Sequence, residues 1–257
     1  MNEGSAFNLS GRNALVTGAS RGLGRHFAVT LAKAGAQVAL AARDADQLAR
    51  VAAEIRHLGA NAEVFTMDVT RRESVVAALD LIGERMGTID AVINNAGITN
   101  TARALDVSFD TWNAVLDTNL TGAWIVAQET ARRMVAAKRG GSIVNVTSIL
   151  ASRVAGGVAP YAASKAALRQ LTRSLALEFA QFGIRVNSLA PGYIVTELNR
   201  EFLLSGPGEK LRTRIPGQRF GTFEDLDGAL LLLASDAGAY INGAEIVVDG
   251  GHLCNSL

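Results

Sequence analysis

Strand-like and helix-like segments alternate along the whole chain of 257 residues. Short apolar runs occupy positions 13–17, 37–42, 62–67, 89–93, 142–147, 184–189 and 245–248. Between most of these runs, apolar residues recur at helical spacing. A chain that alternates in this way forms a parallel sheet with helices on both faces and right-handed crossovers. We therefore expect one α/β domain over residues 1–257.

A glycine-rich turn separates the first apolar run from the first expected helix. It reads Gly18-Ala-Ser-Arg-Gly22-Leu-Gly24, and the helix is expected from His26 to Lys33. Glycines let the backbone approach a pyrophosphate closely, and a helix N-terminus offers free N–H groups. The stretch therefore indicates a dinucleotide site, although a tight turn without a ligand would have the same pattern.

The end of the second run bears on which dinucleotide would bind. Sites for NAD usually place an acidic residue there, whereas this run ends Ala41-Ala42-Arg43. A guanidinium can form paired hydrogen bonds with a 2′-phosphate, and Arg21 adds a second charge nearby. The two arginines favour NADP(H). Asp44 leaves NAD(H) open as a displaced acidic residue, but we interpret it as the N-cap of a helix over 45–58.

Polar or small residues also follow the later runs. Asp68-Val69 follows the third run, Asn94-Asn95-Ala96-Gly97 the fourth, and Pro191-Gly192 the sixth. The Asp68 carboxylate could accept a hydrogen bond from an adenine amino group, or it could cap a helix over 71–85. Because ligands of parallel sheets collect at the carboxyl ends of the strands, we expect these residues to share one edge.

Tyr161 and Lys165 lie at the start of an expected helix whose first turn contains Pro160. They are four residues apart and therefore share one helix face. A cation about 4 Å away stabilises a phenolate by roughly 4 kcal/mol at a dielectric of about 20. This predicts that Lys165 lowers the pKa of Tyr161 by up to about three units before burial opposes it. Ser148, at the end of the fifth run, adds a hydroxyl that could hold a carbonyl or alcohol oxygen. The alternative to a catalytic pair is an ordinary amphipathic helix with Tyr161 and Lys165 on its surface.

Asn119 lies inside a helix expected to begin after Ser108, where Asn is not favoured. Local conflicts of this kind cluster at functional sites, but a buried, hydrogen-bonded Asn would explain it equally well. The irregular stretch 197–221 predicts a substrate lid or a loosely helical surface insertion. Its basic residues, which face an acidic substrate or solvent, are Arg200, Lys210, Arg212 and Arg214.

Charge and composition exclude several classes of function. The 25 basic and 24 acidic residues give a net charge of +1 and no basis for nucleic-acid binding. No apolar run approaches the roughly 18 residues of a membrane span. The single Cys254 and the absence of a signal pattern at the first residues predict a cytoplasmic protein. His26, His57 and His252 lack ligand spacing, so we expect structural histidines and no metal site.

Taken together, these motifs resemble the classical short-chain dehydrogenase/reductases, and bacterial members of the gluconate 5-dehydrogenase and 3-oxoacyl-(acyl-carrier-protein) reductase type in particular. The resemblance covers nearly the whole chain and implies a Rossmann-type, doubly wound, seven-stranded parallel sheet, usually in homotetramers. It implies a catalytic tetrad of Asn119, Ser148, Tyr161 and Lys165. The cofactor contacts that follow are Gly18, Ser20, Arg21, Gly22, Leu23, Gly24, Arg43, Asp68, Val69, Asn95, Ala96, Gly97, Tyr161, Lys165, Pro191, Gly192, Ile194 and Thr196.

The expected reaction is hydride transfer between a nicotinamide and the carbonyl or secondary alcohol of a keto-sugar acid, a polyol or a 3-oxoacyl compound. In this interpretation Tyr161 donates the proton, Ser148 holds the substrate oxygen, Lys165 holds the nicotinamide ribose, and Asn119 keeps a water that links Lys165 to solvent. A non-catalytic NADP(H)-binding redox regulator is the alternative, although such a binder does not need Ser148 and Tyr161 together. An epimerase or dehydratase of this fold usually has a longer C-terminal domain.

Overall fold

A seven-stranded parallel sheet forms the centre of the molecule, in the order β3-β2-β1-β4-β5-β6-β7. The computed structural model describes residues 6–196 and 199–254. The strands are β1 (Asn13–Thr17), β2 (Gln37–Ala42), β3 (Ala62–Thr66), β4 (Ala91–Asn94), β5 (Gly141–Val146), β6 (Ile184–Pro191) and β7 (Glu245–Val248). β1 pairs with β2 on one side and with β4 on the other, so the direction of winding reverses between β1 and β4. Ligands of such sheets bind where that reversal occurs.

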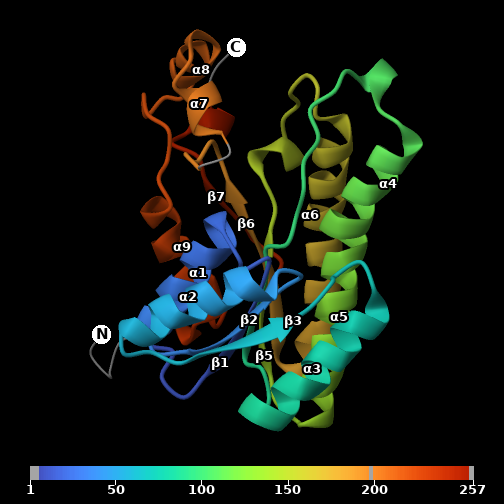
Figure 1. Cartoon of the computed structure of the whole chain (residues 1–257), viewed down its shortest axis with the longest axis vertical. Helices are drawn as coiled ribbons and strands as arrows, with labels where there is room; N and C mark the ends of the chain where they lie inside the picture. The colour runs from blue at the N-terminus through green and yellow to red at the C-terminus, as the bar shows by residue number, and fades with distance from the viewer. Residues whose placement is uncertain (1–5, 197–198, 255–257) are drawn as a thin grey trace.

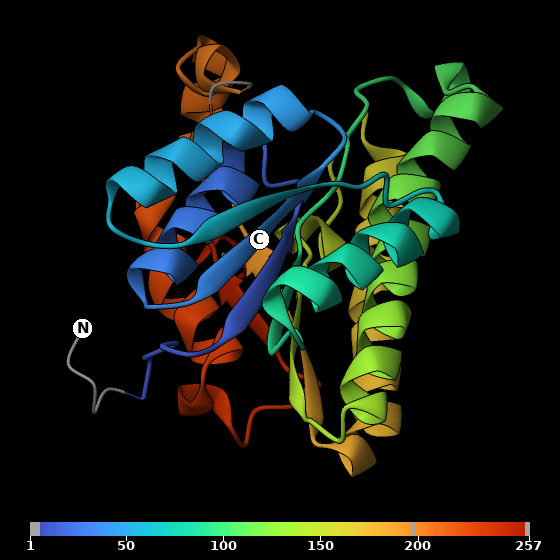
Figure 2. The same cartoon turned by 60° about the horizontal axis from the view of Figure 1, so that its bottom comes forward.

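Helices cover both faces of this sheet (Figures 1 and 2). One face carries α1 (Gly22–Lys33), α2 (Ala45–His57) and α9 (Asp227–Ala234). The other carries α3 (Arg72–Met86), α5 (Gly122–Ala136) and α6 (Ala159–Phe179), and α4 (Phe109–Leu116) packs on α6. Ala14 and Val16 of β1 pack into one core and Leu15 into the other, so the strand is buried on both sides. The doubly wound, Rossmann-type fold is confirmed.

Two helix starts follow their sequence signals. The Asp44 carboxylate accepts a hydrogen bond from the backbone N–H of Gln47 at 3.0 Å, which confirms it as the N-cap of α2. Ser108 accepts from the N–H of Thr111 at 3.1 Å at the start of α4. The helix expected after Ser108 is not uniform, however, because a π-helical turn, η2 (Asp117–Thr121), joins α4 to α5.

The stretch expected to be irregular contains two short helices, α7 (Arg200–Leu203) and α8 (Gly206–Arg212), seen at the top of Figure 1. Pro207 is the second residue of α8, where proline fits because the first turn of a helix does not need its missing N–H. Gly208 is required by close packing, since an added Cβ would lie 2.2 Å from the carbonyl oxygen of Leu203. A β-bridge between Ile194 and Gly221 closes the base of this segment, and its positions 197 and 198 lie outside the described residues.

Candidate active site

The glycine-rich turn lies at the carboxyl end of β1, against the segment that follows β4. Gly18 has a φ of 65°, and an added Cβ would lie 2.9 Å from the Cα of Ala96. At Gly24 an added Cβ would lie 2.2 Å from the carbonyl oxygen of Gly18, so the first turn of α1 packs directly on the loop. Gly22, with a φ of 55°, has open space around its Cβ position. The turn is therefore tight on its protein side and open on the other, as a pyrophosphate site requires.

Asn95 and Thr17 hold the ends of β1 and β4 together. Asn95 Nδ2 donates to the carbonyl oxygens of Thr17 and Gly18 at 3.0 and 3.3 Å. The Thr17 hydroxyl accepts from the backbone N–H groups of Asn95 and Ala96, both at 3.1 Å. Thr17 was not among the expected site residues, although a buried threonine at the end of an apolar strand is the signal that could have identified it.

The two arginines expected near a 2′-phosphate lie on the surface beside this turn. Arg21 is exposed and occupies the N-cap position of α1, and its side chain makes no hydrogen bond or ion pair with the described residues. Arg43 follows β2 and is also exposed. Its charge contributes to lowering the pKa of Asp68, across the carboxyl ends of β2 and β3. Arg21 and Arg43 are thus two cations at the same edge of the sheet, and neither contacts a carboxylate of the described residues. Such a pair could bind an anionic ligand.

Asp68 does not cap α3, whose N-cap is Arg71. Its Oδ1 accepts from the backbone N–H and the hydroxyl of Thr70 at 3.0 and 2.7 Å, which forms a local turn. Burial raises the pKa of Asp68, but the hydrogen bonds from Thr70 and the charges of Arg43 and Arg71 give a net lowering. Val69 is buried against the first residue of α5, so it positions this loop.

Lys165 is buried on the first turns of α6, with 4% of its surface exposed. Its Nζ donates to the carbonyl oxygen of Val146, the last residue of β5, at 2.7 Å. No carboxylate compensates this charge within the described residues, and burial lowers the pKa of Lys165 to about 8. Its Nζ also lies 5.6 Å from the ring centroid of Tyr161 and 3.6 Å from the Cβ position of Gly97. The ammonium therefore faces both Tyr161 and the loop after β4.

Tyr161 and Ser148 meet at the carboxyl end of β5. Ser148 begins a short 3-10 turn, and its hydroxyl accepts from the N–H of Leu150 at 3.1 Å. Burial raises the pKa of Tyr161, and a hydrogen bond with Ser148 only partly offsets this effect. The expected lowering of the Tyr161 pKa by Lys165 is therefore wrong for the protein without a cofactor, because the cost of burying a phenolate exceeds the stabilisation that its neighbours supply.

Asn119 lies in the π-helical turn and is fully buried. Its amide forms two hydrogen bonds with the backbone of Ile98, at 2.8 and 2.9 Å, and Nδ2 donates to the hydroxyl of Ser164 at 3.0 Å. Ser164 in turn donates to the carbonyl oxygen of Tyr161 at 2.7 Å. Asn119 thus ties the loop after β4 to α6. Ser164 was not an expected site residue, although its place between Tyr161 and Lys165 could have indicated it.

The residues expected at the nicotinamide end lie at the last position of β6 and just after it. The backbone N–H of Gly192 donates to Val248 O at 2.9 Å, and a Cβ at Gly192 would lie 2.7 Å from the Cα of Asp249. Pro191 and Ile194 are buried, and the N–H of Thr196 donates to the side chain of Asn199 at 2.7 Å. Ser20 and Leu23, in the glycine-rich turn, are half-buried.

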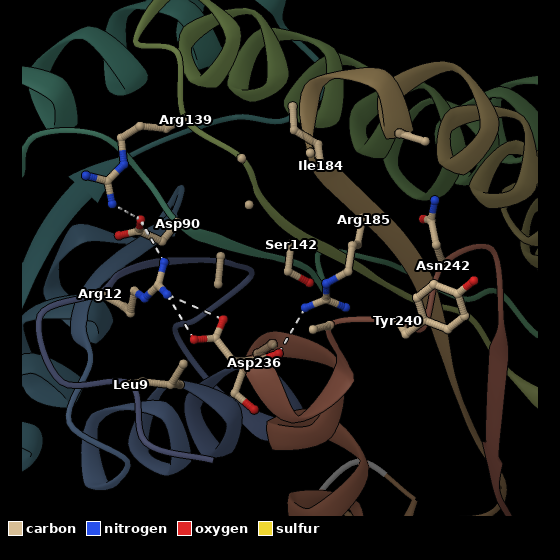
Figure 3. A pocket seen from close by; sticks show the side chains of 18 of the residues that line it. Leu9, Arg12, Asp90, Arg139, Ser142, Ile184, Arg185, Asp236, Tyr240 and Asn242 are labelled. Atoms are coloured by element: carbon tan, nitrogen blue, oxygen red, sulfur yellow. Dashed lines mark hydrogen bonds and ion pairs between the residues drawn. The ribbon is translucent and has the colours of Figure 1, made fainter. Parts of the chain in front are cut away.

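A cavity of about 750 Å³ lies at the opposite, amino edge of the sheet (Figure 3). Asp90 accepts from Arg139 at 2.6 Å and lies 3.6 Å from Arg12, which also bonds Asp236 at 3.1 Å. Arg185 donates to three backbone carbonyls. Because these charged groups have protein partners and the strands of this fold bind ligands at their other ends, we do not place the active site there.

The carboxyl edge, by contrast, combines a phenol, a hydroxyl and a buried amine beside an open glycine turn. No group of three or more His, Cys, Asp or Glu side chains that could hold a metal occurs among the residues that the structure describes. None of the described helices is long and apolar enough to cross a membrane. This arrangement can hold a nucleotide and move a proton at a neighbouring oxygen.

Comparisons with known proteins agree with this description. A family model described as Enoyl-(Acyl carrier protein) reductase matches residues 18–252. Gluconate 5-dehydrogenase of Gluconobacter oxydans (strain 621H) is 38% identical over 252 residues, 98% of this chain and 98% of that protein. A 3-oxoacyl-(acyl-carrier-protein) reductase of Escherichia coli (strain K12) is 37% identical over 244 residues, 95% of this chain and 98% of that protein. A crystal structure of a gluconate 5-dehydrogenase from Burkholderia cenocepacia J2315, in complex with NADP and tartrate, has a TM-score of 0.94 and 39% identity, and the match covers 98% of each chain.

Proposed function

The chain belongs to the classical short-chain dehydrogenase/reductase family, and from this premise we propose that it is an NADP(H)-dependent oxidoreductase acting on a carbonyl or secondary alcohol of a small molecule. The observation that carries the proposal is the meeting of Tyr161, Ser148 and buried Lys165 at the carboxyl edge that also holds the glycine turn. The relatives described above are named dehydrogenases and reductases, and none of these names supports a non-catalytic redox regulator.

The residues at the glycine turn fit a bound NADP(H), which would supply the hydride. The open side of Gly22 would take the pyrophosphate, next to the first N–H groups of α1. Arg21 and Arg43 would bind the 2′-phosphate, since both are exposed and neither has a carboxylate in contact. The second carboxylate oxygen of Asp68 accepts no hydrogen bond from the described residues and would serve the adenine side of the site. The NADP in the Burkholderia cenocepacia relative supports this choice of cofactor.

Proton transfer would depend on Tyr161, Ser148 and Lys165. During reduction of a carbonyl, the O–H bond of Tyr161 breaks and its proton goes to the substrate oxygen, which the Ser148 hydroxyl holds in place. The Tyr161 oxygen keeps the electron pair, and the Lys165 ammonium, 5.6 Å from the ring centroid, stabilises the resulting phenolate. Oxidation of a secondary alcohol runs the same transfer backwards. Asn119 positions α6 through Ser164, and a water between Asn119 and Lys165 would return the proton.

Several wider properties belong to the same proposal. Residues 1–257 form one domain in which 197–221 acts as a substrate lid, hinged at the Ile194–Gly221 bridge. The protein is a homotetramer, which the exposed apolar side chains of Phe109 and Leu177 on neighbouring helices support. It works in the cytoplasm, in keeping with the single exposed Cys254. Light scattering on the purified protein measures the oligomeric state directly.

A dehydrogenase screen tests the function. Sugar acids, polyols, steroids and 3-oxoacyl thioesters are supplied with NADP(H) and, separately, with NAD(H), and absorbance of the reduced nicotinamide is followed. We expect turnover of at least one class with NADP(H) faster than with NAD(H). A protein that binds NADPH but oxidises or reduces none of these classes would contradict the proposed enzyme.

A further inference from the structure

Three side chains from separate loops meet where β5, β6 and β7 end. Arg153 follows Ser148 by five residues, Tyr193 follows β6, and His252 follows β7. Nη1 of Arg153 donates to the backbone oxygen of His252 at 2.5 Å, and the rings of Tyr193 and His252 have centroids 5.6 Å apart. We call Arg153, Tyr193 and His252 the His252 cluster. Because β5, β6 and β7 are neighbours in the sheet, the cluster lies on the same edge as Ser148.

The position of the cluster places it on the substrate side of the crevice. In the proposed function, the adenosine and pyrophosphate of the dinucleotide occupy the carboxyl ends of β1 to β4, where the glycine turn, Arg43, Asp68 and Asn95 lie, and the nicotinamide reaches the residues at the end of β6. The substrate must then meet the nicotinamide beside Ser148, in the part of the edge that the loops after β5, β6 and β7 surround. The following inference rests on that proposed function.

His252 has an unusual environment for a structural histidine. The residue is 7% exposed, and its Nδ1 is buried without a hydrogen-bond partner. Burying a polar nitrogen in this way is unfavourable, and most such atoms in folded proteins have a partner. His26, in contrast, is 2.7 Å from the carboxylate of Asp227. The difference indicates that Nδ1 of His252 has a partner outside the described residues, and a bound ligand would supply one.

The charge around His252 is mainly positive. Burial and the charges of Arg153 and Arg214 lower the pKa of His252, and the carboxylate of Asp249 opposes them. Both Asp249 oxygens already accept hydrogen bonds from backbone N–H groups of its own turn. Apart from the bond to His252, the Arg153 guanidinium makes no hydrogen bond to the described residues. The Arg153 guanidinium therefore has N–H groups that could donate hydrogen bonds to an anion on this side of the site.

We propose that the His252 cluster binds an anionic group of the substrate, so that the substrate is a small hydroxy acid. The guanidinium of Arg153 donates to the carboxylate, and Nδ1 of His252 provides a second hydrogen bond to it. The Tyr193 hydroxyl, which has no hydrogen bond among the described residues, lies beside the same group. A neutral polyol or an uncharged acyl chain would leave these donors without an acceptor.

Tartrate binding tests the cluster without turnover. Titration of tartrate into the complex of the protein with NADP⁺ is followed by calorimetry for wild type, Arg153→Leu and His252→Leu. We expect the Kd for tartrate to rise at least about tenfold in both variants, since each removes a hydrogen bond to a charged group. Arg153→Lys should bind with an intermediate Kd because it keeps the charge. Arg50→Leu on α2 is the matched control and should leave the Kd unchanged, since Arg50 is exposed and makes no hydrogen bond or ion pair with the described residues.

Kinetics with a charged and a neutral substrate of the same chain length separates recognition from folding. For Arg153→Leu we expect kcat/KM for D-gluconate to fall at least about tenfold and kcat/KM for D-glucitol to change less than about threefold. Equal losses for both, or unchanged tartrate binding in both leucine variants, would overturn the inference. Oxidation of neutral alcohols without binding of tartrate would overturn it but leave the oxidoreductase intact. Arg153-dependent tartrate binding without turnover of any alcohol would support the anion site and contradict the proposed enzyme.

Discussion

At the amino edge of the sheet, the Asp90 carboxylate accepts hydrogen bonds from Arg139 and from the backbone N–H of Asn13. At the carboxyl edge, the Lys165 ammonium is buried, and its one hydrogen-bond partner among the described residues is the carbonyl of Val146. Both charges are almost fully buried, at 6% and 4% exposure. One is compensated by opposite charge and the other is not. A buried charge is therefore paired with an opposite charge at the amino edge of the sheet and is not so paired at the carboxyl edge.

This difference separates residues that hold the fold from residues that we propose to be catalytic. A compensated ion pair keeps its charge state and fixes the strand ends, and removing one member leaves the other without a partner. An uncompensated buried amine has a shifted pKa, and such groups cluster at sites where protons move. Mutations at the amino edge should therefore lower stability without lowering turnover, and mutations at the carboxyl edge should lower turnover without lowering stability.

The largest expected effect is that of Tyr161→Phe on turnover. Without the Tyr161 hydroxyl, the acid left at the substrate oxygen is the Ser148 hydroxyl, which is much weaker than a phenol, and general acid catalysis contributes about a hundredfold to ten-thousandfold. We expect kcat to fall about a thousandfold while the Kd for NADPH changes less than about twofold. Steady-state kinetics and fluorescence titration measure the two quantities.

Tyr240→Phe is the matched control at the opposite edge. It removes the same hydroxyl from a fully exposed tyrosine that lines the amino-edge cavity, and kcat should not change. A near-normal kcat for Tyr161→Phe would contradict the proposal that the carboxyl edge carries the proton transfer.

Asp90→Asn should reduce stability without reducing kcat. The substitution keeps the size of the side chain but weakens the hydrogen bonds that the charged carboxylate accepts from Arg139 and from the N–H of Asn13, so we expect the free energy of unfolding to fall by about 2 kcal/mol. Urea denaturation measures the change. Asp236→Asn in the same cavity removes an exposed partner of Arg12 and should cost less than about 1 kcal/mol. A fall in kcat with unchanged stability would reverse the roles that we assign to the edges.

Lys165→Met should stabilise the cofactor-free protein while it abolishes turnover. The lowering of the Lys165 pKa from 10.5 to about 8 corresponds to a destabilisation of the wild type by roughly 3 kcal/mol, which the substitution removes. The substitution also loses the hydrogen bond to Val146, which costs about 1 kcal/mol. The unfolded state binds more protons between pH 8 and 10.5, so the penalty in the wild type is complete below pH 8 and is relieved as the pH rises. We therefore expect the variant to be more stable by about 2 kcal/mol at pH 7.

Urea denaturation of both proteins at pH 7 and at pH 9.5 provides the test. The advantage of Lys165→Met should shrink at the higher pH. A variant that is less stable at pH 7, or an advantage that does not depend on pH, would show that the buried amine is compensated after all.

Most of the fold could be predicted from the sequence because its signals are local. Apolar runs predicted the strands, and Asp44 predicted the start of α2 by a hydrogen bond three residues away. The carboxyl edge was predicted for the same reason, since parallel strands place their ends together. The contact of Asn119 with Ser164, 45 residues away, depends on packing between α6 and the π-helical turn and has no local signal. The raised pKa of Tyr161 could not be predicted either, because burial was not known.

The smallest expected effect concerns two exposed arginines, one at each edge. Arg43 has no carboxylate in contact, so Arg43→Ala should leave the free energy of unfolding unchanged and raise the Kd for NADPH about tenfold by removing a hydrogen bond to the 2′-phosphate. The Kd for NADH, which lacks that phosphate, should change less than about twofold. Arg139→Ala should do the opposite, because its partner Asp90 is buried: stability falls and both cofactor affinities persist. Fluorescence titrations with the two nucleotides measure the affinities, and equal losses for NADPH and NADH in Arg43→Ala would mean that the cation after β2 does not select the cofactor.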